Sequence, residues 1–490
     1  MAVLRFARRR ARETDPPGVP TLMIGAGSTG RVLAQALLAD PRRMRPIGFL
    51  DADSPHERVC GLPLLGGPED IAEVAARTGA RAVVLAHPAM SREDVAELAG
   101  RAWAAGLSLR WLPACPEHGR RGVRIQDLRE IRLSWVIGRD EVSVAGSRAG
   151  RLIEGRRVLV TGASGTVGAA LSREIARLGP AGLWLLDQDA GRLDLVQREI
   201  AGSRQVAADL RDRERLTRVF DEIRPELVFH LAGRSKLAPL EADPCEAVRT
   251  NVRTAHHMVE SAVRLGTQRF VLVSTDKAAD PASVLGATKR LAEMVLQTAA
   301  GGPTCFATVR LGNLIGTPGS LLSVLASRIP RNETVTLAHP EVARHFMTVE
   351  EAAGLVLEAA ALAEEAETFV LDMGGPVPVV ELVHRYAEQL CLPEVTIRFS
   401  GLGPGEKLAE KVFSDGERQV RTAHPKIWGT RPAPLPPGLP RLLGALYEAA
   451  DRGDDPEVRI LLRRLLPEYH PVRRPGPTFA PTGTTDPEVL

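Results

Sequence analysis

Four residues that could exchange protons with a bound molecule stand in a row: Ser274, Thr275, Asp276 and Lys277 follow the apolar segment 270–273. A carboxyl group and an amine can both move protons. A lysine does so when burial or a nearby cation, here Lys289, brings its pKa toward neutral. An Asp–Lys pair is also common as a simple salt bridge. Its place at the end of a strand-like segment favours chemistry, because ligands of open α/β sheets bind at the carboxyl ends of strands.

A glycine-rich turn, TGASGTVG at 161–168, lies upstream of this pair and joins a strand-like segment to a helix-like one. Such glycines permit a tight turn and let a diphosphate approach the positive end of the helix. Asp187 ends the next strand-like segment. A carboxylate there binds ribose hydroxyls and repels a 2′-phosphate, so NAD is expected rather than NADP, which stays the alternative. A Rossmann unit that holds no cofactor is the other possibility.

The cofactor site is expected to include residues beyond the turn. Asp209, at the end of the third strand-like segment, is placed to face the adenine. The full predicted set is Gly162, Ser164, Gly165, Thr166, Val167, Gly168, Asp187, Asp209, Leu210, Ala232, Asn251, Ser274 and Lys289.

A second glycine motif occurs earlier in the chain, at Gly25, Gly27 and Gly30. It also follows a strand-like segment and opens a helix-like one, and Asp51 ends the next strand. Two roles are possible for this motif: the unit binds a nucleotide, or the turn is purely structural. Catalysis in this unit is not expected.

The alternation of apolar strand-like segments with helix-like ones starts near residue 20 and starts again near residue 156. This predicts an α/β protein with two tandem Rossmann-like, doubly wound parallel sheets. The expected divisions are a disordered basic terminus (1–19), a first Rossmann-like domain (20–145), an extended short-chain dehydrogenase domain with a small C-terminal substrate region (150–430), and a Pro-rich linker with short helices and a tail (431–490).

The composition is that of an ordinary globular protein. The chain has 490 residues, a formal net charge of +3 and five scattered cysteines without metal-ligand spacing. We therefore expect no nucleic-acid partner and no metal. No segment approaches the ~20 apolar residues of a membrane span, and the start carries no secretory signal. The expected location is the cytoplasm.

Several segments together resemble a known family, the polysaccharide-biosynthesis nucleotide-sugar 4,6-dehydratases that act on UDP-N-acetylglucosamine. Its signature is similar to TDKAADPASVLGATKRLAE at 275–293. Further matching segments are FHLAG (229–233), DPCEAVRTNV (243–252), VRLGNLIGTPGS (309–320), HPEVARHFMTVEEA (339–352), FVLDMGGPV (369–377) and GLGPGEKLAEKV (401–412). Long members of the family carry membrane helices before the first unit, so this chain resembles a soluble form.

The resemblance implies a redox-neutral 4,6-elimination on a UDP-sugar with a tightly held nicotinamide cofactor, by a protein that is usually a homo-oligomer. It implies that Lys277 removes the C5 proton, that Asp276 protonates the departing C6 hydroxyl, and that Thr275 binds the C4 oxygen. Lys289 completes the catalytic set. The implied substrate contacts are Lys236, Asn313, Arg344 and Glu406.

The chain departs from the family at several positions. Leu285 stands where related dehydrogenases have the proton-accepting Tyr, one helical turn before Lys289. One branch of the family has an apolar residue there and retains the C5 configuration, so retention is expected. Leu237 and Gly403 replace a usual His and Arg. These changes leave two alternatives open: a nucleotide-sugar epimerase, and a cofactor-binding pseudoenzyme that serves as a sensor or regulatory subunit.

Overall fold

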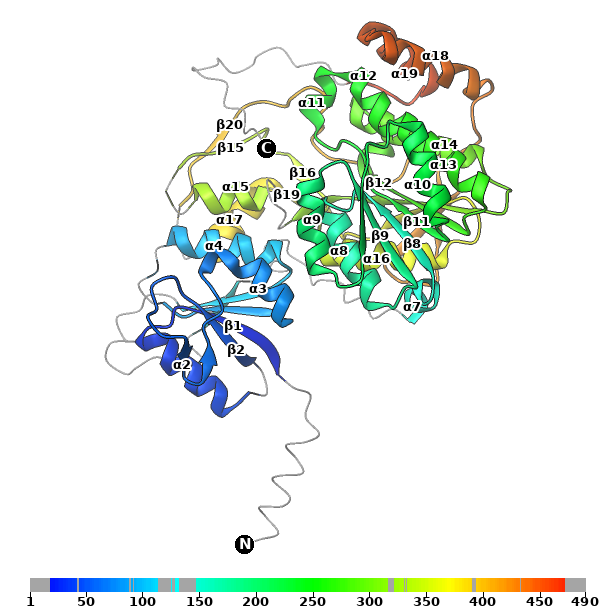
Figure 1. Cartoon of the computed structure of the whole chain (residues 1–490). Helices are drawn as coiled ribbons and strands as arrows, with labels where there is room; N and C mark the ends of the chain where they lie inside the picture. The colour runs from blue at the N-terminus through cyan, green and yellow to red at the C-terminus, as the bar shows by residue number, and fades with distance from the viewer. Residues whose placement is uncertain are drawn as a thin grey trace. The chain divides into compact units, whose positions relative to one another are not determined.

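The two alternating patterns fold into two separate parallel sheets, shown in a computed structural model (Figure 1). The structure describes residues 18–41, 44–87, 90, 92–112, 125, 128–131, 147–315, 321–329, 331, 333–389, 394–431 and 433–471. The predicted α/β fold class with two Rossmann-like units is confirmed. Most of the predicted disordered terminus lies outside the described residues, although Val19 already belongs to the first strand.

The first unit has a five-stranded sheet, in which the last strand runs antiparallel to its neighbour. Leu33, Ala34 and Leu37 form the buried stripe of the first helix, α2 (Ser28–Ala39), which follows the glycine turn. Two further helices are α3 (Ile71–Thr78) and α4 (Arg92–Ala104). Across the sheet the strands are β2 (Met44–Leu50), β1 (Val19–Ile24), β5 (Ala82–Leu85), β6 (Ser108–Trp111) and β7 (Arg129–Ile131).

Segments from far along the sequence complete the first unit. The described residues of 1–136, 316–335 and 383–396 form one compact unit, and the rest of the described chain forms the other. Helix α15 (Leu321–Arg328) packs on α4, and the Tyr386 ring of α17 (Val379–Gln389) lies edge-on to Trp103. This division differs from the predicted one, in which the second domain ran without interruption from 150 to 430.

The second unit has a nine-stranded sheet. Its first seven strands are parallel to one another. The eighth strand pairs antiparallel with both the seventh and the ninth. Its first six strands have the 3-2-1-4-5-6 order of the classic dinucleotide-binding fold. Across the sheet they are β10 (Arg204–Ala207), β9 (Gly182–Asp187), β8 (Arg157–Thr161), β11 (Leu227–His230), β12 (Arg269–Thr275), β13 (Cys305–Leu311), β18 (Glu367–Leu371), β22 (Ile427–Arg431) and β21 (Arg418–Arg421).

Alternate strand residues of this sheet enter two different cores, as a doubly wound fold requires. Leu159 packs in one core with α10 (Arg213–Ile223), α13 (Thr254–Leu265) and α14 (Val284–Thr298). Val158 and Val160 pack in the other core with α7 (Ser147–Ile153), α8 (Thr166–Arg177), α9 (Ala190–Glu199) and α16 (Val349–Leu362). Helix α14 is buried from Val284 to Leu296 and lies at the centre of its layer.

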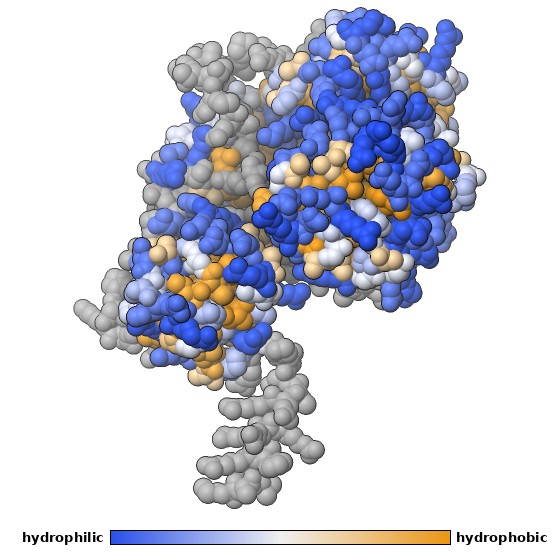
Figure 2. Space-filling view, viewed as in Figure 1, coloured by the Kyte–Doolittle hydropathy of each residue, from blue (hydrophilic) through white to orange (hydrophobic). Residues whose placement is uncertain are grey.

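Two C-terminal helices, α18 (Leu439–Arg452) and α19 (Asp455–Leu465), extend the first of these cores (Figure 1). They are the short helices expected after the Pro-rich linker, and the predicted tail from 472 onward lies outside the described residues. The face of the protein in Figure 2 is mostly hydrophilic, with hydrophobic residues in a few patches. In the described chain, no helix combines the length and the apolar character needed to cross a bilayer.

Candidate active site at the carboxyl ends of the parallel strands

The turn between β8 and α8 is shaped for a diphosphate. Gly162 has a φ of +70°, and a Cβ there would lie 2.7 Å from the backbone nitrogen of Ala232. A Cβ on Gly168 would overlap the carbonyl oxygen of Gly162, so the helix packs directly on the turn. The N-cap of α8, Gly165, provides no side-chain hydrogen bond. Free N–H groups and close backbone approach fit the phosphates of a dinucleotide.

Asp187 lies across this turn, at the end of β9. Its Oδ2 accepts the backbone N–H of Ser164 at 3.1 Å, and its Oδ1 accepts the N–H of Asp189 at 3.2 Å. The side chain is half-buried, so its carboxylate is fixed beside the glycine turn and can still meet solvent or a ligand. This is where the ribose of a dinucleotide lies in the Rossmann fold.

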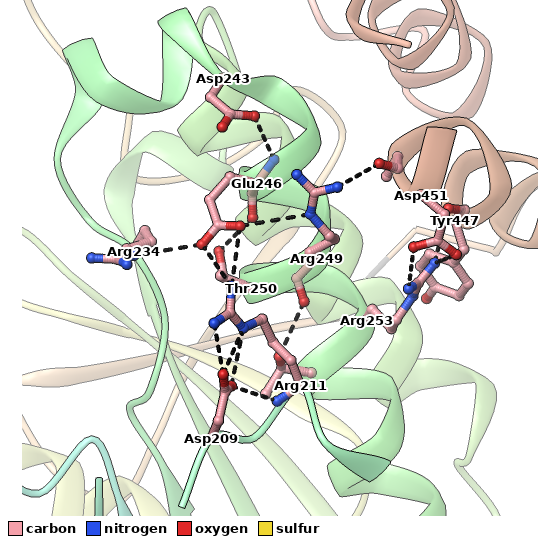
Figure 3. Close-up of polar contacts among 12 residues, drawn as sticks. Asp209, Arg211, Arg234, Asp243, Glu246, Arg249, Thr250, Arg253, Tyr447 and Asp451 are labelled. Atoms are coloured by element: carbon pink, nitrogen blue, oxygen red, sulfur yellow. Dashed lines mark hydrogen bonds and ion pairs between the residues drawn. The ribbon is translucent and has the colours of Figure 1, made fainter. Parts of the chain in front are cut away.

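Asp209 ends the adjacent strand segment within a charged cluster (Figure 3). Arg211 grips its carboxylate, with Nε and Nη2 at 3.0 and 2.6 Å from Oδ2. This hydrogen bond to Arg211 is the main reason that the pKa of Asp209 is lowered. Arg211 also contacts Glu246, which pairs with Arg249 at 3.6 Å. The predicted adenine-facing carboxylate is therefore held by protein groups, and the next residue, Leu210, is buried.

Asn251 lies in a π-helical turn, η3 (Val248–Arg253), a feature frequent at functional sites. Its amide accepts the N–H of Arg234 and donates to the carbonyl of Arg234 and to Thr288. The side chain thus fixes the loop after β11. Helix α18 clamps the same turn, because Arg253 binds both Asp451 and the carbonyl of Tyr447 (Figure 3).

The run that follows β12 brings the predicted catalytic side chains together. Lys277 Nζ lies 3.0 Å from Asp276 Oδ1 and 3.1 Å from Asn313 Oδ1. Thr275 donates its hydroxyl to Asp276 Oδ1 at 3.0 Å. Asp276 is fully buried, and its Oδ2 has no hydrogen-bond partner in the described part of the chain. A buried carboxylate oxygen is costly to leave unpaired, so Oδ2 lacks a hydrogen bond that such an oxygen normally receives.

Lys289 lies in the same region, with Nζ donating to the carbonyl of Val273 at 3.3 Å. Burial lowers the pKa of Lys289 to about 8, and the charge of Glu293 partly opposes this. Burial also lowers the pKa of His230 to about 3; its Nδ1 lies 2.7 Å from the Thr161 hydroxyl. Leu285, one turn before Lys289, packs in the apolar core, so this position offers no proton acceptor.

A buried ionic network joins the end of β12 to α14 and β13. Ser274 donates to Glu293, which receives two hydrogen bonds from Arg310, at 3.0 and 2.8 Å. Arg310 also makes two bonds to Glu417, which precedes β21. Ser274, predicted as a cofactor contact, is therefore bonded toward the protein interior.

The four predicted substrate residues are placed differently from one another. Asn313 binds Lys277, whereas Lys236 is exposed at the start of helix α11 (Leu237–Ala242). Arg344 donates to the carbonyls of Ala343 and Leu408. Glu406 accepts the N–H of Gly403 at 2.6 Å and so closes its own loop.

Two groups beside the catalytic pair were missed by the sequence reasoning, His345 and Glu410. His345 and Glu410 interact electrostatically with each other, and His345 also interacts with Asp276 and Lys277. His345 stands next to Arg344 in a segment that was recognised by its motif, but the motif alone gave no sign that its ring lies near Lys277. Lys407, three residues before Glu410, forms an ion pair with Asp280 at 2.9 Å and so holds the Glu410 segment near the loop that follows Lys277.

The chain was compared with known proteins and structures. A family model described as "Polysaccharide biosynthesis protein" matches residues 158–432. The chain is 32% identical over 419 residues to the probable polysaccharide biosynthesis protein EpsC of Bacillus subtilis. The matched region covers 83% of this chain and 70% of that protein. It is also 32% identical to the capsular polysaccharide biosynthesis protein CapD of Staphylococcus aureus, over 83% of this chain and 71% of the relative.

A solved structure, Pen from Bacillus thuringiensis, superposes with a TM-score of 0.53 at 26% identity, covering 58% of this chain and 89% of that chain. The resemblance predicted from the sequence motifs is confirmed by the family match and by the Rossmann fold of the matched region. The chain therefore belongs to the polysaccharide biosynthesis protein family.

Proposed function

We propose that this protein catalyses the NAD-dependent 4,6-dehydration of a UDP-N-acetylhexosamine, with UDP-N-acetylglucosamine as the first candidate. The observation that supports this most is the pair formed by the buried Asp276 and the partly buried Lys277 at the carboxyl end of β12. One carboxylate oxygen faces the amine, and the other has no partner among the residues that the structure describes. Such a pair offers one group that can donate a proton and another that can accept one, as an elimination requires.

The cofactor in this proposal is held by the turn at Gly162–Gly168 and by Asp187, with Lys289 at the nicotinamide end. The geometry of the turn and the carboxylate at the end of β9 support NAD rather than NADP. The chemistry that this cofactor would supply when bound is reversible hydride transfer, with sugar C4 as the donor and C6 as the acceptor. The described residues do the remaining work, which is to orient the sugar and move protons.

The protons balance on two side chains. Asp276, as the carboxylate, accepts the proton of the C4 hydroxyl as C4 becomes a ketone. The same proton then leaves with the C6 hydroxyl as water. Lys277, as the free amine, takes the proton from C5, which the ketone has made acidic. The ammonium so formed exchanges its protons with solvent and then protonates C5 at the end. Leu285 supplies no proton acceptor, so the C4 proton goes to the unpaired oxygen of Asp276.

The relatives support both this reaction and an alternative. The UDP-N-acetylglucosamine 4,6-dehydratase (inverting) of Campylobacter jejuni is 24% identical over 281 residues, or 55% of this chain and 80% of that enzyme. The UDP-glucose 4-epimerase of Rickettsia felis is 27% identical over 196 residues, or 39% of this chain. Epimerisation at C4 does not require a base for the C5 proton, so the Asp276–Lys277 pair favours dehydration.

The test is mass spectrometry of UDP-N-acetylglucosamine after incubation with the protein in heavy water. Dehydration predicts loss of one water and uptake of one solvent deuterium at C5. Lys277→Ala should be inactive, because no other group takes the C5 proton. Lys411→Ala is the matched control, since this lysine is exposed and pairs with Asp415.

Each other outcome has a different meaning. Deuterium uptake without loss of water would identify an epimerase that acts at C5. An unchanged mass across a panel of UDP-sugars, with NAD bound, would favour a cofactor-binding protein without catalytic activity. Full activity in Lys277→Ala would exclude the proposed base.

A further inference from the structure

His345 carries an imidazole in which one ring nitrogen makes no hydrogen bond within the described part of the chain. Its Nδ1 is buried and has no hydrogen-bond partner among the residues that the structure describes. Buried polar atoms are nearly always paired, so an unpaired nitrogen beside a reactive group indicates a proton or a ligand to be bound there. No step of the proposed dehydration involves this side chain.

Backbone pairing brings His345 next to Asn313, and the His345 ring interacts electrostatically with Asp276 and Lys277. Strand β14 (Asn313–Ile315) pairs with β17 (Phe346–Thr348), and the N–H of Asn313 donates to the carbonyl of His345 at 2.8 Å. Gly312 permits this approach, because a Cβ there would lie 3.3 Å from the Cβ of His345. The side chain of Asn313 in turn accepts from Lys277 Nζ. His345 and Lys277 thus lie on the two sides of Asn313.

The proposed reaction starts from Lys277 as the free amine, so the ammonium form of Lys277 carries one proton that must first be moved elsewhere. In the structure Lys277 pairs with the Asp276 carboxylate at 3.0 Å, the contact of an ammonium with a carboxylate. An ammonium cannot accept the C5 proton. One proton must therefore leave Nζ before the elimination, and it must stay close enough to return afterwards.

We propose that His345 is the proton acceptor that receives this proton from Lys277 and returns it after the reaction, directly or through one water. The imidazole nitrogen gains the proton and Nζ becomes a free amine, so charge is conserved and no further reactant is needed. His345 acts on the sugar only through Lys277 and is therefore a positioning residue. The inference rests on the proposed dehydration.

The charges that face the ring suit this exchange. Burial lowers the pKa of His345, which favours the neutral ring in the resting protein. The carboxylates of Asp276 and Glu410 oppose this effect, whereas the Lys277 ammonium adds to it. When Lys277 gives up its proton, the opposing cation is lost and the imidazolium is stabilised. Glu410 is itself buried and lies 3.6 Å from Lys407.

The first experiment compares turnover of UDP-N-acetylglucosamine by the wild type, His345→Ala, His345→Phe and the control His339→Ala. We expect His345→Ala to lose about 100-fold or more of kcat, the usual contribution of a positioned acid–base group, with KM unchanged. Added imidazole should restore part of kcat in His345→Ala, where it can enter the space, and none in His345→Phe. The control should match the wild type.

A kcat of His345→Ala near the wild-type value would overturn the proposal. A loss that imidazole does not relieve, with the same pH dependence of kcat as the wild type, would also overturn it, because a purely structural role predicts that pattern.

A second measurement does not depend on turnover. The pH titration of the His345 ring is followed by NMR in the wild type and in Lys277→Met. The proposal predicts a higher pKa of His345 in Lys277→Met, because a neighbouring cation is removed. No change would overturn the linkage. A raised pKa in a protein that dehydrates none of the UDP-sugars would instead leave the linkage in place and overturn the proposed reaction.

Discussion

The two glycine turns of this protein have nearly the same geometry. Gly25 and Gly162 both have positive φ, +96° and +70°. A Cβ on Gly30 would overlap the carbonyl oxygen of Gly25, as one on Gly168 would overlap that of Gly162. In each unit the helix can therefore pack on the turn only if the third position is glycine.

The acids opposite the turns also correspond. Asp51 Oδ2 accepts the N–H of Ala26 at 2.6 Å, as Asp187 Oδ2 accepts the N–H of Ser164 at 3.1 Å. A carboxylate in this position thus stabilises the turn itself, whether or not a ribose is bound. The motif by itself does not distinguish a binding site from a structural joint.

The residues opposite the two turns differ more than the turns themselves. The first turn faces His87, an exposed residue whose Cβ lies 3.4 Å from the Cβ position of Gly25. The second turn faces the loop after β11, where Lys289 Nζ lies 3.6 Å from the Cβ position of Gly233. The two units therefore differ at the carboxyl ends of the strands next to each turn. In the second unit these ends lie beside buried ionisable groups.

The largest expected effect concerns the buried cation. Burial lowers the pKa of Lys289 from 10.5 to about 8, so the unfolded chain binds more protons between these values and stability rises with pH there. The free energy of unfolding should rise by roughly 3 kcal/mol over this interval. Lys289→Met should abolish the rise in urea unfolding followed by circular dichroism, whereas His87→Gln should keep it. A rise that persists in Lys289→Met would show that another group titrates.

The third glycine of each turn gives the next largest effect. In Gly168→Ala the new methyl group displaces α8 from the turn, and we expect kcat/KM for dehydration to fall about 100-fold, as for a misplacement of about 1 Å. Gly30→Ala makes the same clash in the first unit. It should lower the stability of that unit and leave kcat/KM per folded molecule unchanged. Equal losses in the two variants would mean that the first turn also serves catalysis.

The elements that position the site could be predicted from the sequence because their signals are local. The strand–turn–helix at Gly162, the carboxylate at the end of β9 and the reactive run after β12 each depend on a short stretch of chain. The strand order then brings the ends of β8, β11 and β12 to one edge of the sheet, as parallel pairing requires.

Other features depend on contacts between distant segments and could not be predicted. The packing of α15 on α4 assigns a late segment to the first unit, and no local pattern encodes it. The proximity of His345 to Lys277 follows from the pairing of β14 with β17. The grip of Arg211 on Asp209 depends on side-chain rotamers, which the spacing of the residues does not fix.

The smallest expected effect distinguishes the two acids. Asp187→Asn removes the charge opposite the second turn, and a charged hydrogen bond to a ribose hydroxyl is worth about 1.5–3 kcal/mol, so NAD affinity should fall about tenfold or more. Asp51→Asn changes the same contact in the first unit and should leave NAD affinity unchanged, as measured by calorimetry on protein freed of cofactor. Because Asn can still accept the backbone N–H, both variants keep the turn. A fall of NAD affinity in Asp51→Asn would show that the first turn binds the dinucleotide as well. The two turns would then bind the same ligand and differ only in the reactive groups that lie beside them.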